Sequence, residues 1–505
     1  HGLQIMQAPI DATTTSTARS KAWNAALAAR PGALDLHIAA DRIEGVIPPA
    51  LRGGRMLSNG PGWTRIGDWT AHPFDGHGYV RAFEFQDDGS VRLRARFVET
   101  RIYRDELAAG RFLHRGFATN VPGPSWRNLG LGLGPVRNVA NTTVLRWGDR
   151  LLAGWEGGEP HALDPDSLAT RGPETLDGAI AGQITLAHMA RDPISGRLIT
   201  CSISGRKQVS FCFREFDDQL RQCASSQGTI EGPLFTHDFA FTRSWTIVAD
   251  NPLQVDGREF LRTLLGRSTL LRSIATRETP GLLHLIARDQ ARAGETAVRT
   301  IRLPGPAIVV HFANAHEEED GTLIIDACAF DHFDFGEEFG YAGPQAPFDP
   351  SLPDTRAPQR LRRYTIAPGA SEARCEQLIP QALDFPRIDP RQAGGRATRL
   401  FGASRSDTRH ADPFDTVLAL DLRDRERPPQ LWTAPRDVFV GEPIPAVVAG
   451  EEQVRYVMAL LSDGLREQTT LAIFAADDLA AGPVAAVPMP LLPIAFHGDW
   501  DTTEA

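Results

Sequence analysis

The sequence has very few lysines and no long basic or apolar run, and these absences exclude several classes of protein. Only two of its 505 residues are lysine, Lys21 and Lys207, and the formal net charge is −10. A chain of this charge without a basic cluster argues against a nucleic-acid partner. No uninterrupted apolar run approaches the roughly 18 residues that a membrane-spanning helix needs, so none is expected.

Cysteine is also scarce. The five cysteines are odd in number and form no CxxC pair; they are Cys201, Cys212, Cys223, Cys328 and Cys375. This usage favours free thiols in a reducing compartment over a disulfide framework, and we therefore expect a cytoplasmic protein. With 42% hydrophobic and 23% charged residues, the composition is that of an ordinary globular chain with enough length for a large core.

Short strands separated by turn residues dominate what is present. Residues 78–99 predict a hairpin, because apolar residues broadly alternate on both sides of an Asp-Gly turn. Residues 144–172 predict three more short strands separated by Gly-Asp, Gly-Gly and Asp-Pro turns. Helical periodicity is convincing near the N-terminus, at 20–30, and weaker at 257–267.

The number of strands indicates an all-β chain, and its length exceeds that of a single sandwich, so we expect a β-propeller. No motif of about 40 residues repeats, so the number of blades cannot be read from the sequence. Residues 1–20 are expected to be disordered, and 21–505 to form one domain, because no linker divides them. The Pro-rich segment 337–359 is expected to be a long functional loop or lid.

Histidine carries the chemical information. Four of the fourteen histidines lie in apolar or turn-flanked strand segments: ITLAHMARD (His188), PLFTHDFAF (His237), AIVVHFANA (His311) and PIAFHGDW (His497). They are too far apart for a local metal motif, but a closed β architecture can bring residues of several blades to one axis. Taken singly, each is better explained as a core or turn histidine whose hydrogen bonds are satisfied, and spacing alone does not change that interpretation.

A series of ordered motifs resembles the carotenoid cleavage oxygenase family over roughly residues 40–500. The motifs are IPPALRGGRMLSNGPG, HPFDGHGYVRAFEF, VRNVANTTVLRWGDRLLAGWEGGEPHALDP, HDFAFT, HFANAHEEEDG, DFPRIDP, GEPI and the terminal FHG. The resemblance implies a seven-bladed β-propeller capped by loops and helices that form a hydrophobic tunnel over an axial metal site.

The resemblance also implies the residues of that site. One Fe(II) per chain would be held by His188, His237, His311 and His497, with O₂ as co-substrate. Carboxylates would fix the histidine rings, and the matching positions are Glu156, Glu442 and Asp384. Asp384 stands where the family has a glutamate, and its shorter side chain would need a backbone adjustment or a water to reach its histidine. Many members have a second histidine after the third ligand, where this chain has Phe312.

The reaction implied is oxidative cleavage of a conjugated C=C bond in an apocarotenoid to two aldehydes, with a retinal-type product. Such an apolar substrate comes from lipid, which favours peripheral contact with a membrane. Two alternatives stay open: cleavage of a lignostilbene or another hydroxystilbene, and a non-catalytic propeller used as a binding scaffold. The sequence leaves the oligomeric state open. His72 and His77, on either side of an Asp-Gly turn, are expected to be solvated or to cap that turn.

Overall fold

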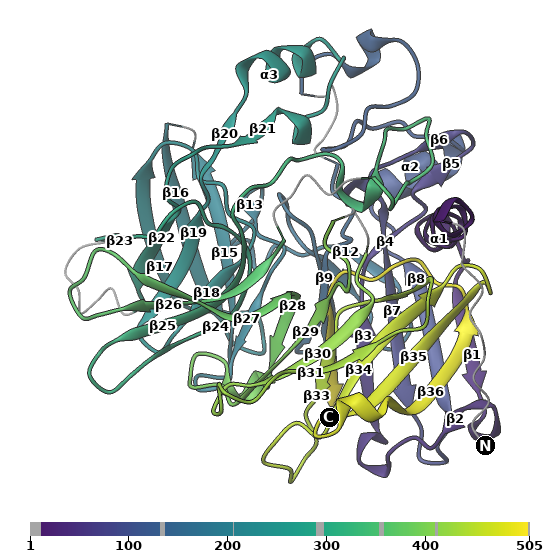
Figure 1. Cartoon of the computed structure of the whole chain (residues 1–505). Helices are drawn as coiled ribbons and strands as arrows, with labels where there is room; N and C mark the ends of the chain where they lie inside the picture. Colours follow the sequence, from purple (N-terminus) through teal and green to yellow (C-terminus); the bar gives the residue numbers. More distant parts are fainter. Residues whose placement is uncertain are drawn as a thin grey trace.

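The computed structural model describes residues 12–131, 137–205, 207–288, 297–352, 358–409 and 413–502. Within these ranges, strands dominate and helices are few (Figure 1). Seven antiparallel sheets contain four or more strands each, and two further sheets are two-stranded. The prediction of a seven-bladed β-propeller is therefore confirmed.

The seven sheets are the blades, and the strands of each run in order from the outermost to the innermost. Blade one contains β1 (Leu34–Ile38), β8 (Val91–Phe97), β7 (His77–Phe85), β3 (Gly54–Ser58) and β37 (Gly498–Thr502), with β4 (Pro61–Gly62) paired to β7. Blade two contains β12 (Thr170–Pro173), β11 (His161–Leu163), β10 (Arg150–Gly154) and β9 (Thr143–Trp147). Blade three contains β17 (Gln222–Glu231), β16 (Gln208–Phe216), β15 (Arg197–Gly205) and the short β13 (Ile184–Thr185) and β14 (Ala190–Asp192). Blade four contains β23 (Arg299–Arg302), β22 (Leu282–Ala287), β19 (Trp245–Asp250) and β18 (Phe239–Phe241).

The remaining three blades follow the same order. Blade five contains β27 (Arg374–Ala382), β26 (Arg360–Ile366), β25 (Leu323–Phe330) and β24 (Ile308–Glu317). Blade six contains β31 (Gln430–Thr433), β30 (Thr416–Asp421), β29 (Arg399–Ser404) and β28 (Asp384–Ile388). Blade seven contains β2 (Glu44–Gly45), β36 (Pro483–Pro490), β35 (Gln468–Ala475), β34 (Tyr456–Asp463), β32 (Val438–Val440) and β33 (Ile444–Ala446). The two-stranded sheets are β5 (Arg65–Ile66) with β6 (Trp69–Thr70), and β20 (Leu253–Val255) with β21 (Ile274–Thr276).

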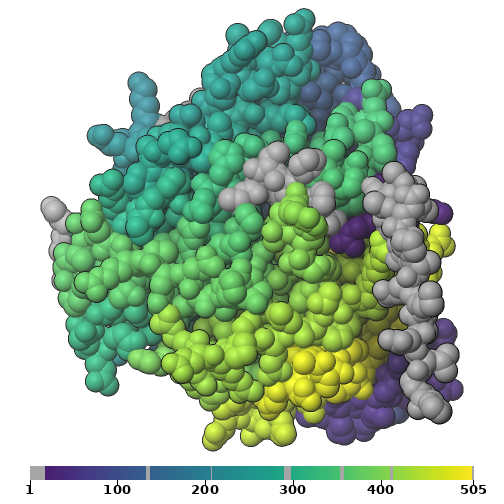
Figure 2. Space-filling view, viewed as in Figure 1, coloured from purple at the N-terminus to yellow at the C-terminus, as the bar shows by residue number. Residues whose placement is uncertain are grey.

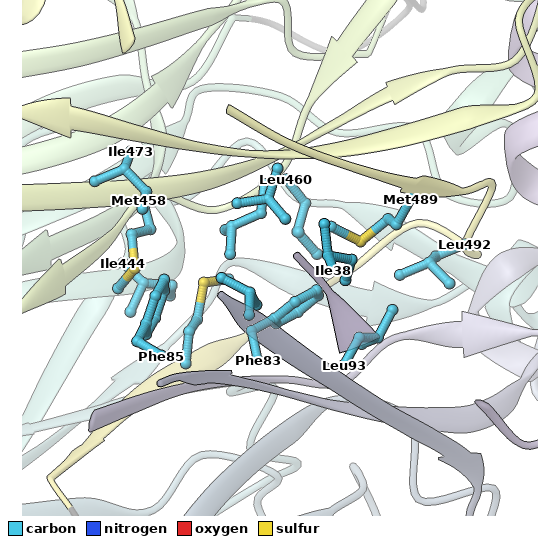
Figure 3. Packing of buried hydrophobic residues seen from close by; sticks show 14 of the residues in the cluster. Ile38, Phe83, Phe85, Leu93, Ile444, Met458, Leu460, Ile473, Met489 and Leu492 are labelled. Carbon is cyan, nitrogen blue, oxygen red and sulfur yellow. The ribbon is translucent and has the colours of Figure 1, made fainter. Parts of the chain in front are cut away.

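Blade one is closed by strands from both ends of the chain. Strand β37 pairs with β3 in antiparallel register from Gly54 opposite Thr502 to Ser58 opposite Gly498. Within that pairing, the buried Arg55 donates to Asp501 over 2.7 Å. A continuous apolar core then joins the first and last blades, as Figure 3 shows with Phe83, Phe85 and Leu93 facing Met458, Leu460 and Ile473.

The predicted hairpin is confirmed as β7 and β8, joined by a turn in which the Gln86 N–H donates to the Ser90 carbonyl. The two expected helices are present as α1 (Ala12–Ala28) and α3 (Gly257–Leu264). Residues 1–11 lie outside the described residues, and α1 begins within the segment for which disorder was expected. The sequence pattern did not predict α2 (Arg101–Ala109), although Thr100 caps its first turn and Gly110 ends it in a left-handed conformation.

Helix α1 packs against blade seven and against the 337–359 segment through one buried tryptophan. Trp23 is 3% exposed, and its ring lies edge-on to Phe439 with 4.8 Å between centroids. Its indole N–H donates to the Phe339 carbonyl over 2.8 Å. Asn24 adds a reciprocal pair of hydrogen bonds with the backbone of Phe348. The 337–359 segment, predicted to be a long functional loop or lid, is thus hydrogen-bonded to the N-terminal helix at Phe339 and Phe348. Its residues 353–357 lie outside the described residues.

Replacing Trp23 with Ala should lower the free energy of unfolding by about 3–5 kcal/mol, because a fully buried aromatic ring and its hydrogen bond are lost. Urea unfolding followed by fluorescence would measure this loss. Trp126→Ala is the matched control, because Trp126 is 61% exposed and its removal should change stability by no more than about 0.5 kcal/mol. Equal midpoints for the two variants would contradict the docking role of α1.

Candidate metal centre

The four histidines singled out in the sequence lie together in one cluster. One ring nitrogen of each lies within 4.8 Å of those of the other three. The Nε2 atoms of His188 and His237 are 3.3 Å apart, and the His188 and His497 ring centroids are separated by 4.6 Å. Residues from blades three, four, five and one therefore meet at the point where the inner strands of the propeller converge.

Each histidine sits on or beside an innermost strand, which is why the propeller can gather them. His188 lies between β13 and β14, His237 precedes β18, His311 is within β24 and His497 immediately precedes β37. Strand β24 has an irregular register on both sides of His311, and such bulges re-aim a side chain. Gly498 follows His497 where a Cβ atom would lie 2.4 Å from the Leu57 carbonyl oxygen, so the FHG motif needs its glycine.

The Nδ1 atom of each ring faces a carboxylate. The four Nδ1-to-oxygen distances are 2.6 Å for His311 and Asp384, 3.0 Å for His497 and Glu442, 3.3 Å for His237 and Glu156, and 3.7 Å for His188 and Asp238. The first three carboxylates are those that the resemblance implied. The fourth, Asp238, was not among the sequence candidates, although it directly follows His237 in the HDF motif.

With Nδ1 turned toward a carboxylate, Nε2 is the nitrogen of each ring that remains for the interior of the cluster. The His311 Nε2 atom is buried and has no hydrogen-bond partner within the described part of the chain. A buried ring nitrogen without a partner in a native fold calls for an explanation, and a bound ion is one.

The protonation states also suit a cation. Burial, together with the neighbouring histidines, holds the pKa of His188 well below its ordinary value. Burial lowers the pKa of His497 to about 4 despite the Glu442 carboxylate beside it. For His311 burial acts in the same direction, but the Asp384 carboxylate outweighs it and the pKa is raised. Near neutral pH, His188 and His497 are therefore neutral and keep the lone pair that a metal ligand needs.

Asp384 reaches His311 directly despite its short side chain. Its Oδ1 atom lies 2.6 Å from the ring and also accepts the Phe385 N–H over 2.9 Å. Strand β28 is irregular between Asp384 and Arg387, and Phe385 has a left-handed φ of 50°. The backbone adjustment that the shorter residue requires is thus present in the strand, and no bridging water is needed.

The cluster is buried on one side and more open on the other. The side chains of His311 and His497 are each 8% exposed, whereas those of His237 and Glu156 are 32% and 37% exposed. The buried side carries an aromatic ring, because Phe385 lies 5.5 Å from His311 and 5.0 Å from His497 between centroids. The arrangement therefore combines an apolar wall with a face that small molecules can approach.

His72 and His77 lie outside the cluster, and of the solvated or turn-capping role expected for them, the capping role is confirmed for His72. Both are fully buried. His72 does cap its turn, accepting the Phe74 N–H, and its other nitrogen lies 3.0 Å from Glu338. His77 lies 2.9 Å from Glu106 of α2, which also accepts Arg137 over 2.6 Å. His77 thus joins α2 to blade one, and His72 joins the turn before β7 to the 337–359 segment.

The residues present fit a divalent transition-metal ion. Four imidazoles converge, at least two of them neutral, and imidazole is a preferred ligand of iron, zinc, copper and nickel. Three of the rings have a carboxylate within 3.3 Å of the second nitrogen, the arrangement found around metal-ligating histidines generally, and the fourth ring faces one at 3.7 Å. An ion held by these four nitrogens would be approached by a small molecule from the more exposed side, that of His237 and Glu156.

The chain is similar to known proteins over most of its length. The family model described as "RPE65: Retinal pigment epithelial membrane protein" matches residues 31–502. The apocarotenoid-15,15'-oxygenase of Synechocystis sp. is 33% identical over 480 residues, covering 91% of this chain and 92% of the relative. Carotenoid cleavage dioxygenase 7 of Oryza sativa subsp. japonica, a chloroplastic protein, is 29% identical and covers 90% of this chain and 87% of its own length. The crystal structure of cobalt-substituted Synechocystis ACO has a TM-score of 0.86 at 30% identity, covering 96% of this chain and 99% of that one.

Single replacements of His188, His237, His311 or His497 by Ala should each lower the metal content of the purified protein, because each removes one ring nitrogen from the cluster. The expected loss of affinity is on the order of 10–100-fold or more. Inductively coupled plasma mass spectrometry after anaerobic reconstitution with Fe(II) measures it. His332→Ala is the control, because His332 is half exposed and pairs with Asp334 outside the cluster. A cluster variant with undiminished metal would remove that residue from the site.

Proposed function

The chain belongs to the retinal pigment epithelial membrane protein family, that of the carotenoid oxygenases, and on that premise we propose that it is an Fe(II)-dependent oxygenase cleaving a conjugated C=C bond of an apocarotenoid to two aldehydes. The observation that carries the proposal is the cluster of four histidines, each with its own carboxylate. A propeller used only as a scaffold has no need for that arrangement.

In this proposal His188, His237, His311 and His497 hold one iron ion, and Glu156, Asp384 and Glu442 fix three of the rings. Iron supplies the activation of O₂ when bound. Imidazole is a neutral ligand, so the ion would keep its full charge, and the surrounding carboxylates balance it. Iron is favoured over zinc because the relatives include an oxygenase and a dioxygenase. Activation of O₂ calls for a redox-active ion, and zinc has no redox chemistry.

The chain's own residues have positioning as their main task. Conversion of one alkene and one O₂ into two carbonyl groups leaves no net proton to transfer, so no general acid or base is required. Phe385 presents an apolar surface beside His311 and His497, and Phe496 packs within 6.2 Å of Phe74 and 6.1 Å of Phe339 between ring centroids. Such surfaces hold an apolar polyene and exclude water, which supplies orientation and selectivity.

The identity to the Synechocystis apocarotenoid oxygenase favours an apocarotenoid substrate with a retinal-type product. A hydroxystilbene substrate would benefit from a lysine near its phenol. Lys21 lies exposed on α1, and Lys207 lies exposed at the turn between β15 and β16, so neither is placed for that task. We therefore treat stilbene cleavage as an outcome to be tested.

The Fe(II)-loaded protein, incubated in air with an equimolar mixture of an apocarotenal and a hydroxystilbene, should release retinal-type aldehydes and no benzaldehydes. Mass spectrometry identifies the products. His311→Ala should abolish release, and His332→Ala should leave the rate unchanged. Benzaldehydes alone would replace the proposed substrate class, and absence of both products from an iron-loaded protein would overturn it.

We further infer that the protein takes its substrate from a membrane surface through its cap. None of the helices in the described ranges is long and apolar enough to cross a membrane. Helix α3 and residues 125–131 lie side by side at one end of the molecule and form part of the cap over the propeller (Figures 1 and 2). These two segments expose a group of large apolar side chains. The group consists of Trp126 (61% exposed), Leu129 (41%), Leu131 (59%), Leu261 (57%) and Leu265 (45%).

Two observations favour a lipid surface as the partner of this apolar group. Its members come from two segments that are joined by a bridge between Leu129 and Leu265, so they form one patch. Exposed arginines lie in the same two segments as the patch: Arg127, Arg258, Arg262 and Arg267. A patch of this kind inserts apolar side chains among lipids while cations meet anionic headgroups, each worth about 1 kcal/mol near the surface. The five cysteines are free, in keeping with the cytoplasmic side of such a membrane.

The double variant Trp126→Ser/Leu261→Ser should lower binding to vesicles of mixed neutral and anionic phospholipid by roughly tenfold or more, because two exposed apolar side chains are lost. Flotation of vesicles through a density gradient measures the bound fraction. The matched control is Leu431→Ser/Leu465→Ser, which changes two exposed leucines in blades six and seven. Equal flotation of both double variants would contradict the assignment of this patch.

A further inference from the structure

Asp238 is the carboxylate of the cluster that neither the sequence pattern nor the family resemblance assigned. It directly follows His237 and precedes β18, and its side chain is 11% exposed. Its Oδ1 atom lies 3.7 Å from Nδ1 of His188. We propose that Asp238 is a positioning residue of the metal centre, which orients the His188 ring and fixes the segment of β24 that carries His311. This inference rests on the proposed metal site.

The other three carboxylates are already committed to other rings. Asp384, Glu442 and Glu156 face His311, His497 and His237. Glu156 approaches the segment of His188 only through the backbone, where it accepts the Ala187 N–H over 3.3 Å. Asp238 is thus the carboxylate available to the fourth ring.

The 3.7 Å separation is longer than a hydrogen bond, so Asp238 acts on His188 through its charge. A carboxylate at this distance favours the ring orientation that turns the Nδ1 edge toward it and the Nε2 lone pair toward the cluster. In a buried setting such an interaction is weakly screened and correspondingly strong. A cation bound to Nε2 withdraws electron density from the ring and increases the attraction further.

The same carboxylate also holds two backbone segments. Its Oδ2 accepts the Phe312 N–H over 2.9 Å, and its Oδ1 accepts the Phe239 N–H over 2.7 Å. Phe312 follows His311 and lies between the two register irregularities of β24. Asp238 therefore joins the innermost strands of blades four and five at the position where each delivers a histidine. One side chain links three of the four rings: it is adjacent to His237, faces His188 and anchors the backbone next to His311.

The test compares Asp238→Asn with Asp250→Asn in the full chain. Asparagine retains an acceptor oxygen for a backbone N–H but removes the charge that faces His188. Asp250 is the matched control: it lies on β19 of the same blade, and its carboxylate is 3.4 Å from Nε2 of His284, outside the cluster. The probe is Co(II), whose visible absorption reports coordination geometry, and the titration gives its dissociation constant. The melting temperature of the metal-free protein is recorded for each variant.

We expect Asp238→Asn to bind Co(II) about 10–100-fold more weakly and with a changed visible spectrum, and Asp250→Asn to match the wild type in both. Unchanged affinity and spectrum in Asp238→Asn would overturn the inference alone. So would a weaker affinity with an unchanged spectrum and a lowered melting temperature, because the residue would then act only on stability. Failure of the wild type to bind Co(II) would overturn the metal centre and this inference together.

Discussion

Closure of the propeller by its two chain ends is the constraint on which the candidate metal centre depends. Strand β37 must pair with β3 for blade one to have its innermost strand, and His497 immediately precedes β37. The His497 carbonyl also accepts the Asn59 N–H over 2.9 Å, just beyond the end of β3, and the buried Arg55–Asp501 pair lies further along the same two strands. A chain that failed to close would lose one ring of the cluster and the apolar core shared by blades one and seven. The candidate metal site is therefore a property of the whole ring and of no single blade.

The electrostatics of the cluster depend on the charged side chains that surround the four histidines. Four carboxylates face four imidazoles in a mostly buried space, and one guanidinium, that of Arg387, approaches Glu442 to 3.8 Å. Burial raises the pKa of Asp238, whereas His311 outweighs burial and lowers the pKa of Asp384. Buried charges of one sign are costly unless compensated. A divalent cation at the centre would compensate them, and its binding would then be coupled to the stability of the folded state.

The sequence predicted the histidines because they lie in short motifs, and motifs are local. His188, His237, His311 and His497 could all be named in advance, as could Glu156, Asp384 and Glu442, from the family resemblance. The contact between Asp238 and His188 could not, because it arises from the meeting of blades three and four and no local pattern encodes it. The burial of His77 against Glu106 was not predicted either, because that contact also joins segments that are apart in the sequence. Helix α2 was a different kind of miss: Thr100 and Gly110 mark its ends, but the helix has only nine residues among strands.

The uneven burial of the four rings gives the site a direction. His311 and His497 lie against Phe385 and are nearly inaccessible to solvent, so their side of the cluster is closed. His237 and Glu156 are about one-third exposed, and His188 is intermediate at 16%. A small molecule that binds an ion held by these rings would approach it from the more open side. The two rings with the shortest carboxylate distances, His311 and His497, are thus the least exposed. The two rings nearest the open side, His188 and His237, have the longest carboxylate distances. Support from Asp238 matters most on that side, because rings at an accessible edge have the fewest packing contacts to hold their orientation.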